Sequence, residues 1–384
     1  MKVAVLGYGT VGAGVYSMLS DAPGMEAGPV LVRPGKAVES FMVSDAALIF
    51  GDPTVDAVVE TLGGLDPAYS YGMRALEAGK HFITANKAMV AAHGLELAAL
   101  AREKGAAFLF SAACGGGVPF LHNLALSAEI DRIEAVSGIL NGTTNYMLDA
   151  MQRRSLSYGD ALREAQSLGY AESDPTADVS GLDALRKMQL ACAVAFGVLP
   201  QSGMLCEGME HFTAADVEDI QSRGLVCRLM ARGSRAGESV SAYVEPVLFP
   251  RAAPESSVFT NNNMARYTGK RCGSIVLMGQ GAGRFPTASA VLRDLSAAQQ
   301  GARSMFPENC RAAEADNREA VHSYYIRTGG FAAVRLPLRS VLAQGEVVRA
   351  ATEPMSAEKM HALAQNIRKD GNDLFFAALE EELC

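Results

Sequence analysis

The sequence lacks the patterns that mark several common classes of protein. No apolar run approaches the ~20 residues of a membrane-spanning helix. The seven cysteines are scattered, odd in number and never spaced as Cys-x-x-Cys, and the six histidines form no metal-spaced pair. We therefore expect reduced thiols in a cytoplasmic protein, without a disulfide framework or a zinc site. Met1 leads directly into a predicted strand, which leaves no room for a signal peptide.

A surplus of basic residues is also missing. The net charge is −8 and the isoelectric point is about 5.4, which argues against binding to nucleic acid or to an anionic membrane. We find no internal repeat and no low-complexity segment. The 384 residues, 49% of them hydrophobic, are enough for large cores and for about two to three domains.

The N-terminus carries the pattern strand, G-x-G-x-x-G, helix. An apolar run at 3–6 leads into GYGTVG (7–12), and a helical pattern follows. Gly7 allows a tight turn, Gly9 allows close approach of a pyrophosphate, and Gly12 allows the helix to pack on the strand. This context predicts a dinucleotide-binding domain.

The second strand, near 29–32, ends in Arg33-Pro-Gly-Lys36. NAD sites usually carry an acidic residue at this position, whereas two cations suit the 2′-phosphate of NADP. We favour NADP; NAD and an ordinary basic loop are the alternatives.

Alternating strands and helices continue this domain. Strands are predicted at 56–60, 81–84 and 107–110, with helices at about 67–78 and 89–104. Lys87 follows the strand at 81–84, and the carboxyl ends of strands face the ligand in open α/β sheets, so we expect a functional role for it.

Three glycines at 115–117 follow the last of these strands. Their carbonyl oxygens could hold a monovalent cation, or the segment could be a plain turn between domains. The predicted strand at 133–140 then leads to Asn141-Gly-Thr-Thr, where Thr143 or Thr144 is a candidate helix cap.

The segment 169–187 is dense in ionisable groups. Glu172 and Asp174 lie on a predicted loop, and a helix is predicted from about Thr176 through Ala195. Asp183 and Lys187 are four residues apart and share a face of that helix. The pair is either part of an acid–base site or a surface ion pair.

Five segments together resemble the homoserine dehydrogenases, which interconvert L-aspartate 4-semialdehyde and L-homoserine with a nicotinamide cofactor in threonine and methionine biosynthesis. The segments span residues 1 to about 300 and are GYGTVG (7–12), NKAMVA (86–91), GGGVP (115–119) with GILNGTTNYML (138–148), GYAESDPTADVSGLDALRK (169–187) and GQGAGRFPTASAVLRDL (279–295).

The resemblance implies a role for individual residues. Lys187 is the proton donor and acceptor, Lys87 a second lysine beside the reacting carbon, and Asp183 the carboxylate that orients substrate and lysine. Glu172 grips the α-amino group, and Tyr170 and Thr143 are further substrate-binding residues. The implied cofactor contacts are Thr10, Val11, Arg33, Lys87, Gly169 and Gly283, in addition to Gly7, Gly9 and Gly12 of the glycine motif. The implied sodium or potassium ligands are the backbone carbonyls of Cys114, Gly116 and Val118.

Physical chemistry agrees with these roles. An ammonium near the substrate oxygen stabilises negative charge and delivers a proton. We expect the two lysines to lower each other's pKa, with Asp183 opposing that effect. Two departures from the family are visible: Ser111 stands where the family has Glu at the cation site, and the segment 21–51 is shorter than usual, so the adenosine pocket would be open or reshaped.

We expect an α/β protein with a Rossmann-type doubly wound domain at 1–115, to which about 280–305 returns. A catalytic and dimerisation domain would occupy 116–279, with a helix at 207–220, strands at 226–230, 240–248 and 274–277, and a homodimer formed through its sheet. Pro246 cannot donate to a ladder, so its strand is expected to bend or lie at an edge.

A short C-terminal extension would occupy 306–384. The segment 323–327 resembles the first strand of an ACT-type regulatory domain, but the rest looks too short. We expect a degenerate, structural extension with helices at 359–369 and 372–382.

Three alternatives remain at this point. A reductase for another amino-acid semialdehyde would use the same scaffold. Aspartate-semialdehyde dehydrogenase needs a cysteine nucleophile paired with histidine, and Cys114 has no evident partner. A non-catalytic NADP-binding regulator would have no need of the whole set Lys87, Glu172, Asp183 and Lys187.

Overall fold

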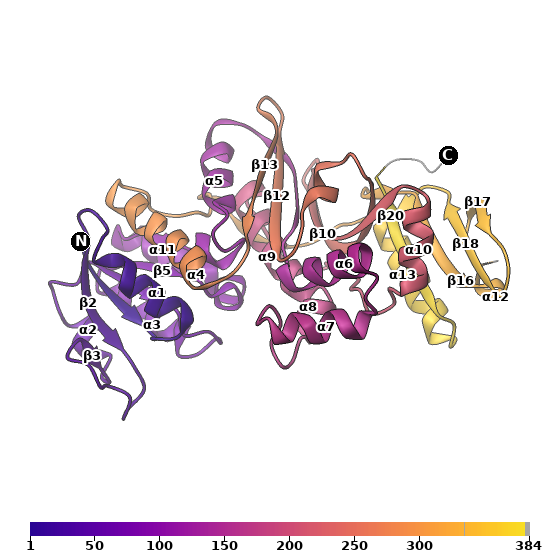
Figure 1. Ribbon diagram of the computed structural model, residues 1–384. Helices are drawn as coiled ribbons and strands as arrows, with labels where there is room; N and C mark the ends of the chain where they lie inside the picture. The colour runs from indigo at the N-terminus through magenta and orange to yellow at the C-terminus, as the bar shows by residue number, and fades with distance from the viewer. Residues whose placement is uncertain (334, 381–384) are drawn as a thin grey trace.

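The chain forms an elongated molecule whose N-terminal, central and C-terminal parts follow one another from end to end (Figure 1). The computed structural model describes residues 1–333 and 335–380. One helix from late in the chain, α11 (Arg284–Gln299), returns to pack against the first helix of the N-terminal part.

The N-terminal part is a six-stranded parallel sheet in the order β3-β2-β1-β4-β5-β6, the order of a dinucleotide-binding fold. Its four strands from β1 toward the β6 edge are short and mostly buried, as parallel strands covered on both faces require, whereas β2 and β3 are partly exposed. The strands are β1 (Lys2–Leu6), β2 (Glu26–Leu31), β3 (Met42–Val43), β4 (Ala57–Glu60), β5 (His81–Thr84) and β6 (Phe108–Leu109). The helices are α1 (Thr10–Leu19), α2 (Ala47–Phe50), α3 (Ala68–Glu77) and α4 (Lys87–Lys104).

A loop at 32–41 joins β2 to β3 where a helix is usual. Phe41, at its end, stacks on Tyr16 of α1 with 4.3 Å between ring centroids. The short second βα unit seen in the sequence therefore corresponds to a missing helix, and an aromatic contact packs this segment against α1.

The central part is built on a mostly antiparallel sheet. Its strands are β7 (Ile133–Ile139), β9 (Leu205–Cys206), β10 (Leu225–Ala236), β11 (Ser239–Pro250), β12 (Asn262–Gly269) and β13 (Gly273–Gln280). Its helices are α5 (Phe120–Ile130), α6 (Gly142–Arg154), α7 (Tyr158–Ser167), α8 (Thr176–Val179), α9 (Leu182–Phe196) and α10 (Ala214–Ser222). Short 3-10 turns lie at Ser111–Ala113 and Pro254–Ser257, and β8 (Val198–Ser202) pairs with β14 (Arg311–Glu314). Helix α9 packs across β7, β10 and β11.

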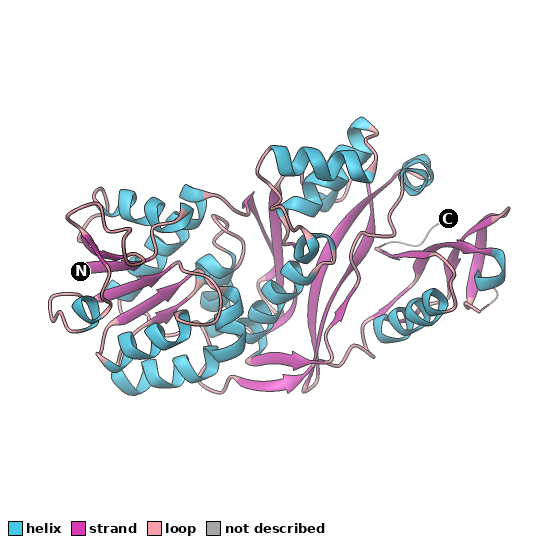
Figure 2. Cartoon of the chain, turned by 90° about the horizontal axis from the view of Figure 1, so that it is seen from below, coloured by secondary structure: helices cyan, strands magenta, loops and turns pink. Residues whose placement is uncertain are grey.

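The C-terminal part has the element order β-α-β-β-α-β. Its elements are β16 (Tyr324–Gly329), α12 (Gly330–Ala333), β17 (Leu338–Ala343), β18 (Val347–Thr352), α13 (Ala357–Lys369) and β20 (Leu374–Leu379), with a small pair of β15 (Val321–His322) and β19 (Met355–Ser356). Strand β20 pairs in parallel with β11, so both parts share one ten-stranded sheet (Figure 2).

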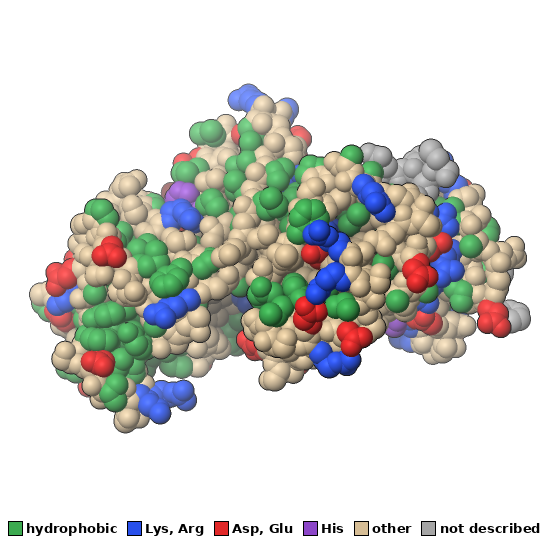
Figure 3. Space-filling view, in the orientation of Figure 1, with side chains coloured by type: hydrophobic (Ala, Val, Ile, Leu, Met, Phe, Trp, Pro, Cys, Tyr) green, Lys and Arg blue, Asp and Glu red, His purple; other side chains and the backbone are tan. Residues whose placement is uncertain are grey.

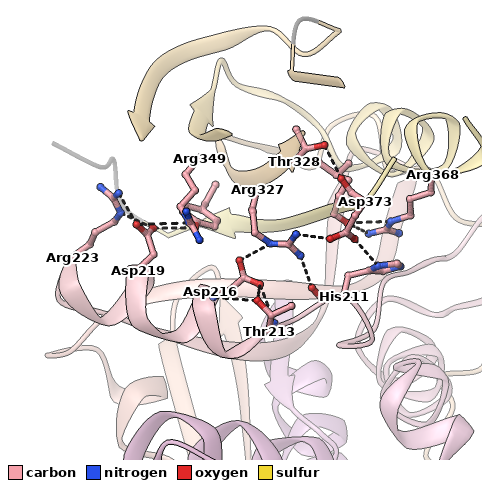
Figure 4. Close-up of polar contacts among 12 residues, drawn as sticks. His211, Thr213, Asp216, Asp219, Arg223, Arg327, Thr328, Arg349, Arg368 and Asp373 are labelled. Carbon is pink, nitrogen blue, oxygen red and sulfur yellow. Dashed lines mark hydrogen bonds and ion pairs between the residues drawn. The ribbon is translucent and has the colours of Figure 1, made fainter. Parts of the chain in front are cut away.

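A buried polar network fastens α10 to this C-terminal sheet (Figure 4). Arg327 of β16 donates from Nε to Asp216 Oδ1 at 2.7 Å and from Nη1 to Asp373 Oδ2 at 2.5 Å. Tyr325 donates its hydroxyl to Asp219 at 2.9 Å, and the ring of Phe375 packs on Phe212. The C-terminal sheet therefore lies between α13 on one face and α10 on the other.

Several sequence predictions are wrong in detail. The segment 372–382 was predicted as a helix, but 374–379 form β20, because Leu-Phe-Phe-Ala-Ala-Leu is buried on both faces between β16 and β11; residues 381 and 382 lie outside the described residues. Strand β11 is central, not an edge, and pairs with β10 through Pro246 without a register shift. Pro246 lacks an N–H, but on the side of β11 away from β10 no strand pairs with it: β9 pairs as far as Val244, and β20 pairs from Val247.

Helix boundaries differ as well. The helix predicted from Thr176 is divided into α8 and α9 by Gly181, whose φ of 83° suits glycine. The helix predicted at 207–220 begins only at Ala214, where Thr213 and Asp216 form a capping box.

The expected fold class, a Rossmann-type domain followed by an α/β domain, is confirmed. Among the described helices none is long and apolar enough to cross a bilayer. Cationic and anionic side chains are interspersed on the face shown in Figure 3.

Candidate active site

Two lysines share one carboxylate where the N-terminal and central parts meet. Asp183 Oδ2 lies 2.6 Å from Lys187 Nζ, and Asp183 Oδ1 lies 3.1 Å from Lys87 Nζ. Lys187 also donates to the carbonyl oxygen of Leu140 at 2.6 Å. The side chains of Lys187 and Asp183 are 12% and 11% exposed, and that of Lys87 is 35% exposed, so a buried carboxylate links an enclosed amine to an accessible one.

The break between α8 and α9 positions this carboxylate. Gly181 ends the first helix, so Asp183 falls in the first turn of α9. A carboxylate is stabilised there by the helix dipole, and Lys187 follows one turn later on the same face. Lys87 is the first residue of α4, which begins where β5 ends.

The charges of the three groups set their protonation. Burial alone would raise the pKa of Asp183, but the ammonium groups of Lys187 and Lys87 outweigh burial and hold that pKa well below its ordinary value. Burial likewise opposes a charge on Lys187, yet Asp183 outweighs burial and raises the pKa of Lys187. The sequence-based expectation of a lowered pKa is therefore wrong for Lys187, because the Asp183 carboxylate, 2.6 Å from its amine, raises that pKa.

The segment 169–187 and the Asn141-Gly-Thr-Thr motif close around one cavity of about 560 Å³. Glu172 and Asp174 line it, and Thr143 donates its hydroxyl to the carbonyl oxygen of Tyr170 at 2.6 Å. The predicted site residues that line this cavity are Lys87, Gly116, Thr143, Gly169, Tyr170, Glu172, Asp183, Lys187 and Gly283.

Asn141 and Asp178 belong to this site but were missed in the sequence. Asn141 donates from Nδ2 to Asp183 Oδ2 at 2.9 Å and to Asp178 Oδ1 at 2.7 Å. Its own oxygen accepts from Thr144 N at 2.8 Å, so Asn141 caps α6, and neither Thr143 nor Thr144 does. The high preference of Asn for the N-cap position could have indicated this.

The glycine motif has the geometry that a dinucleotide needs. Gly7 has φ 97°, and a Cβ on Gly12 would lie 2.2 Å from the carbonyl oxygen of Gly7. Nothing lies within 4 Å of a Cβ built on Gly9, so its backbone is open to a ligand. Thr10 and Val11 form the first turn of α1, whose N-terminus can face phosphates.

The remaining cofactor candidates lie apart from the cavity. Arg33 and Lys36 are exposed in the loop that follows β2. Neither they nor the residues of the 7–12 motif line the cavity around Lys187. A cofactor contacting both regions would run along the carboxyl edge of the six-stranded sheet.

The glycines at 115–117 bring two loops into direct contact. A Cβ on Gly116 would lie 2.4 Å from the carbonyl carbon of Gly281, which precedes α11. The carbonyl oxygen of Val118 accepts from Phe120 N at 2.7 Å. Ser111 donates its hydroxyl to the buried Asp294 at 2.5 Å. Ser111 itself supplies no carboxylate to a cation, and the Val118 carbonyl already accepts a hydrogen bond, so these residues fit a monovalent cation poorly. Close packing of the two loops explains the glycine run.

A larger cavity, about 850 Å³, lies elsewhere and is lined by Arg102, Arg132 and Arg235. It borders the C-terminal ends of α4, α5 and α9. Cations are favoured at such ends by the helix dipoles, so these arginines have a structural explanation. The smaller cavity holds Asp183 and its two lysines and is the candidate active site.

Comparisons with known proteins agree with this geometry. The family model for the homoserine dehydrogenase NAD-binding domain matches residues 7–111, and the model for homoserine dehydrogenase matches residues 119–296. The homoserine dehydrogenase of Synechocystis sp. is 37% identical over 77% of this chain and 72% of its own length. That of Corynebacterium glutamicum is 38% identical over 76% of this chain and 70% of its own.

Solved structures extend the likeness to the C-terminal part. The homoserine dehydrogenase from Thiobacillus denitrificans has a TM-score of 0.87 at 29% identity and covers 99% of this chain and 98% of its own. That of S. aureus has a TM-score of 0.77 at 26% identity and covers 100% and 99%. Family models, relatives and solved structures all lead to one conclusion: the chain belongs to the homoserine dehydrogenase family.

Proposed function

We propose that the cavity around Asp183 binds L-homoserine or L-aspartate 4-semialdehyde, and that Lys187 exchanges the proton at the substrate's terminal oxygen. The observation that carries this proposal is the position of Asp183 between Lys87 and Lys187. NAD(P), when bound, accepts the hydride from homoserine or supplies it to the semialdehyde.

The two directions use Lys187 in opposite protonation states. In reduction, negative charge grows on the aldehyde oxygen, and the Lys187 ammonium stabilises it and gives up a proton to form the alcohol. In oxidation, the neutral amine takes the hydroxyl proton as the hydride leaves the same carbon. Lys87 forms a second ion pair with Asp183, and its ammonium adds positive charge near the reacting oxygen.

Asp183 holds the amine in place. Its hydrogen bond to Lys187, together with the contact between Lys187 and the Leu140 carbonyl, leaves the ammonium with one direction for a third partner. Asn141 fixes the carboxylate in turn. Such fixed geometry lowers the cost of reaching the transition state.

The same cavity suits an amino acid. Glu172 provides a carboxylate for the substrate's α-ammonium, and the carbonyl oxygen of Tyr170 lies beside it, held by Thr143. Asp178 also lines the cavity and accepts a hydrogen bond from Asn141. A substrate bearing an ammonium at one end and an oxygen at the other could bridge Glu172 and Lys187.

We further propose a preference for NADP, supported by the exposed cations Arg33 and Lys36 and by the lack of an acid at the end of β2. The cofactor contacts inferred from the resemblance, Gly7 to Gly12, Gly169 and Gly283, are part of this proposal. A monovalent cation is not part of it, because Ser111 is engaged by Asp294.

A homodimer and a cytoplasmic location complete the proposal. Strand β13 ends the ten-stranded sheet, and its outward side chains Val276 and Met278 are 42% and 60% exposed. Apolar side chains on an edge strand favour pairing with a second copy. The described cysteines are free thiols, as a reducing compartment requires.

A spectrophotometric assay tests the function directly. Purified protein is mixed with L-homoserine and either NADP or NAD, and reduced-cofactor absorbance is followed. We expect turnover, faster with NADP at equal concentration. No turnover with homoserine, while another amino-acid alcohol is oxidised, would contradict the substrate assignment.

A further inference from the structure

Glu60 is a buried carboxylate that the proposed reaction does not use. It is the last residue of β4 and has no solvent exposure. Its Oε1 accepts from the backbone N–H groups of Leu62 at 2.6 Å and Gly63 at 3.1 Å, and its Oε2 accepts from the Thr84 hydroxyl at 2.5 Å. A buried charge is costly unless it is fully hydrogen-bonded, so this arrangement calls for a role.

The hydrogen bonds continue from Thr84 to the start of α4. The hydroxyl oxygen of Thr84 accepts from Asn86 N at 2.9 Å. Asn86 donates from Nδ2 to the Gly64 carbonyl at 2.6 Å, and its Oδ1 accepts from Met89 N at 3.1 Å, which caps the helix. Lys87 is the first residue of that helix.

The direction of this chain is fixed by Glu60. Thr84 has one hydroxyl proton, which it gives to the carboxylate, so its oxygen is oriented to accept from Asn86 N–H. Residue 60 must therefore present an acceptor to Thr84 if the Thr84 hydroxyl is to point toward β4. Thr84 is itself fully buried, so water cannot replace either partner.

The same carboxylate also holds the loop at 62–64. Leu62 lies against the first turn of the glycine motif, since its Cδ2 is 3.1 Å from a Cβ built on Gly7. Asn86 joins the far end of this loop through the Gly64 carbonyl. Glu60 therefore ties the glycine turn of the cofactor domain to the start of α4.

We infer that Glu60 is a positioning residue that acts through Thr84 and Asn86 to fix Lys87 beside Asp183. The inference rests on the role proposed above for Lys87. The Lys87 side chain is long and partly exposed, and its one ion pair with a described residue is with Asp183. Its amine is placed mainly by where α4 begins. A shift of about 1 Å at a reacting group can lower the rate by about 10²-fold.

The test compares Thr84→Val with Thr84→Ser. Valine keeps the shape but removes the hydroxyl, whereas serine keeps the hydroxyl. In Thr84→Val, Glu60 still holds Leu62 and Gly63, so cofactor affinity should stay within about threefold while kcat for homoserine oxidation falls about 10- to 100-fold. Thr84→Ser should restore kcat to within about threefold of the parent.

Two further variants separate positioning from stability. In Glu60→Gln the amide oxygen can keep the bonds to Leu62 and Gly63, but the amide nitrogen then faces Thr84 and its hydroxyl proton loses its acceptor. We therefore expect the kcat loss of Thr84→Val with the loop at 62–64 retained. Val59→Ala weakens the buried core of the same strand without touching the polar chain. It should lower the unfolding temperature and leave kcat unchanged at 25 °C.

The outcomes are distinct. A Thr84→Val enzyme with parental kcat, or a Val59→Ala enzyme with an equal kcat loss, would overturn the inference. Turnover that survives Lys87→Ala would overturn the role proposed for Lys87 instead. A parent enzyme that does not oxidise homoserine would contradict the proposed function. The positioning inference is judged separately, from the ratio of each variant's kcat to that of an active parent.

Discussion

Asp183 Oδ2 lies 2.6 Å from Lys187 Nζ, and both side chains are mostly buried one turn apart on α9. Burial favours the neutral amine of Lys187, whereas Asp183 favours the charged one. The balance raises the pKa of Lys187, so the amine is charged near neutrality, ready for aldehyde reduction.

Asp183→Asn should move the pH dependence of homoserine oxidation. Oxidation needs the neutral amine, so its rate should rise with pH toward the raised pKa of Lys187. Removing the carboxylate takes away the largest influence that raises this pKa and leaves burial, which lowers it, so the rising limb should shift to lower pH. The measurement is kcat/KM against pH for both enzymes. The substrate's own amino group titrates identically in the two, so an unchanged limb would contradict the electrostatic account.

Asp294→Asn should stabilise the fold at high pH but not at low pH. Burial raises the pKa of Asp294 to about 7, against partly offsetting hydrogen bonds from Ser111. Between about pH 4 and pH 7 the folded state holds a proton that the unfolded state releases, so this group lowers stability as pH rises. The full effect is on the order of 4 kcal/mol.

Urea unfolding of the parent and of Asp294→Asn at pH 4 and pH 8 measures this linkage. The variant should gain stability relative to the parent on going from the lower to the higher pH. An equal difference at both values would mean that Asp294 does not titrate in this range.

Arg327→Ala should destabilise the protein strongly. The Arg327 side chain is 9% exposed and that of its partner Asp216 has no exposure. Removing the guanidinium leaves a buried carboxylate without its counter-ion, which costs about 3–5 kcal/mol. Arg335→Ala is the control, because its ion pair with Asp370 is exposed and should be worth about 0–1 kcal/mol. Chemical denaturation of both checks this, and equal losses would show that the network does not fasten α10 to the C-terminal sheet.

Arg33→Ala should weaken NADP binding more than NAD binding. A single phosphate contact from an exposed arginine typically changes affinity by about 10-fold, while NAD lacks that phosphate. KM values for both cofactors, beside those of the distant Lys104→Ala, test this. A parallel rise for both cofactors would place Arg33 outside the phosphate site.

The sequence predicted the elements whose local signals agree with their surroundings. The run at 3–6 with the glycines at 7–12 defined β1 and α1, and the spacing of Asp183 and Lys187 predicted their shared helical face. Fold class was predictable because strands and helices alternate with clear periodicity through the first 110 residues.

The errors arise where distant contacts decide the outcome. The residues at 374–379 are compatible with a helix in isolation, and they form a strand because β16 and β11 lie on either side. Pro246 is tolerated in a central strand because its far-side partners leave a gap there. Asn141 was missed because its partners Asp178 and Asp183 lie 37 and 42 residues later in the chain.

The surroundings of Cys114, the candidate nucleophile of the aspartate-semialdehyde dehydrogenase alternative, also depend on distant contacts. Cys114 was weighed as a nucleophile because the sequence could not give its surroundings. The thiol is fully buried, and burial raises its pKa to about 12, so it is not a thiolate near neutrality. The comparisons favour neither this alternative nor a different semialdehyde reductase.

The central claim is that Lys187 carries the proton in homoserine oxidation, and kcat of Lys187→Ala tests it most directly. Loss of the acid–base group should lower kcat by about 10²- to 10⁴-fold, with cofactor affinity close to that of the parent. Lys104→Ala, which removes an exposed lysine at the end of α4, should retain parental kcat. Turnover within a few-fold of the parent in Lys187→Ala would contradict the account.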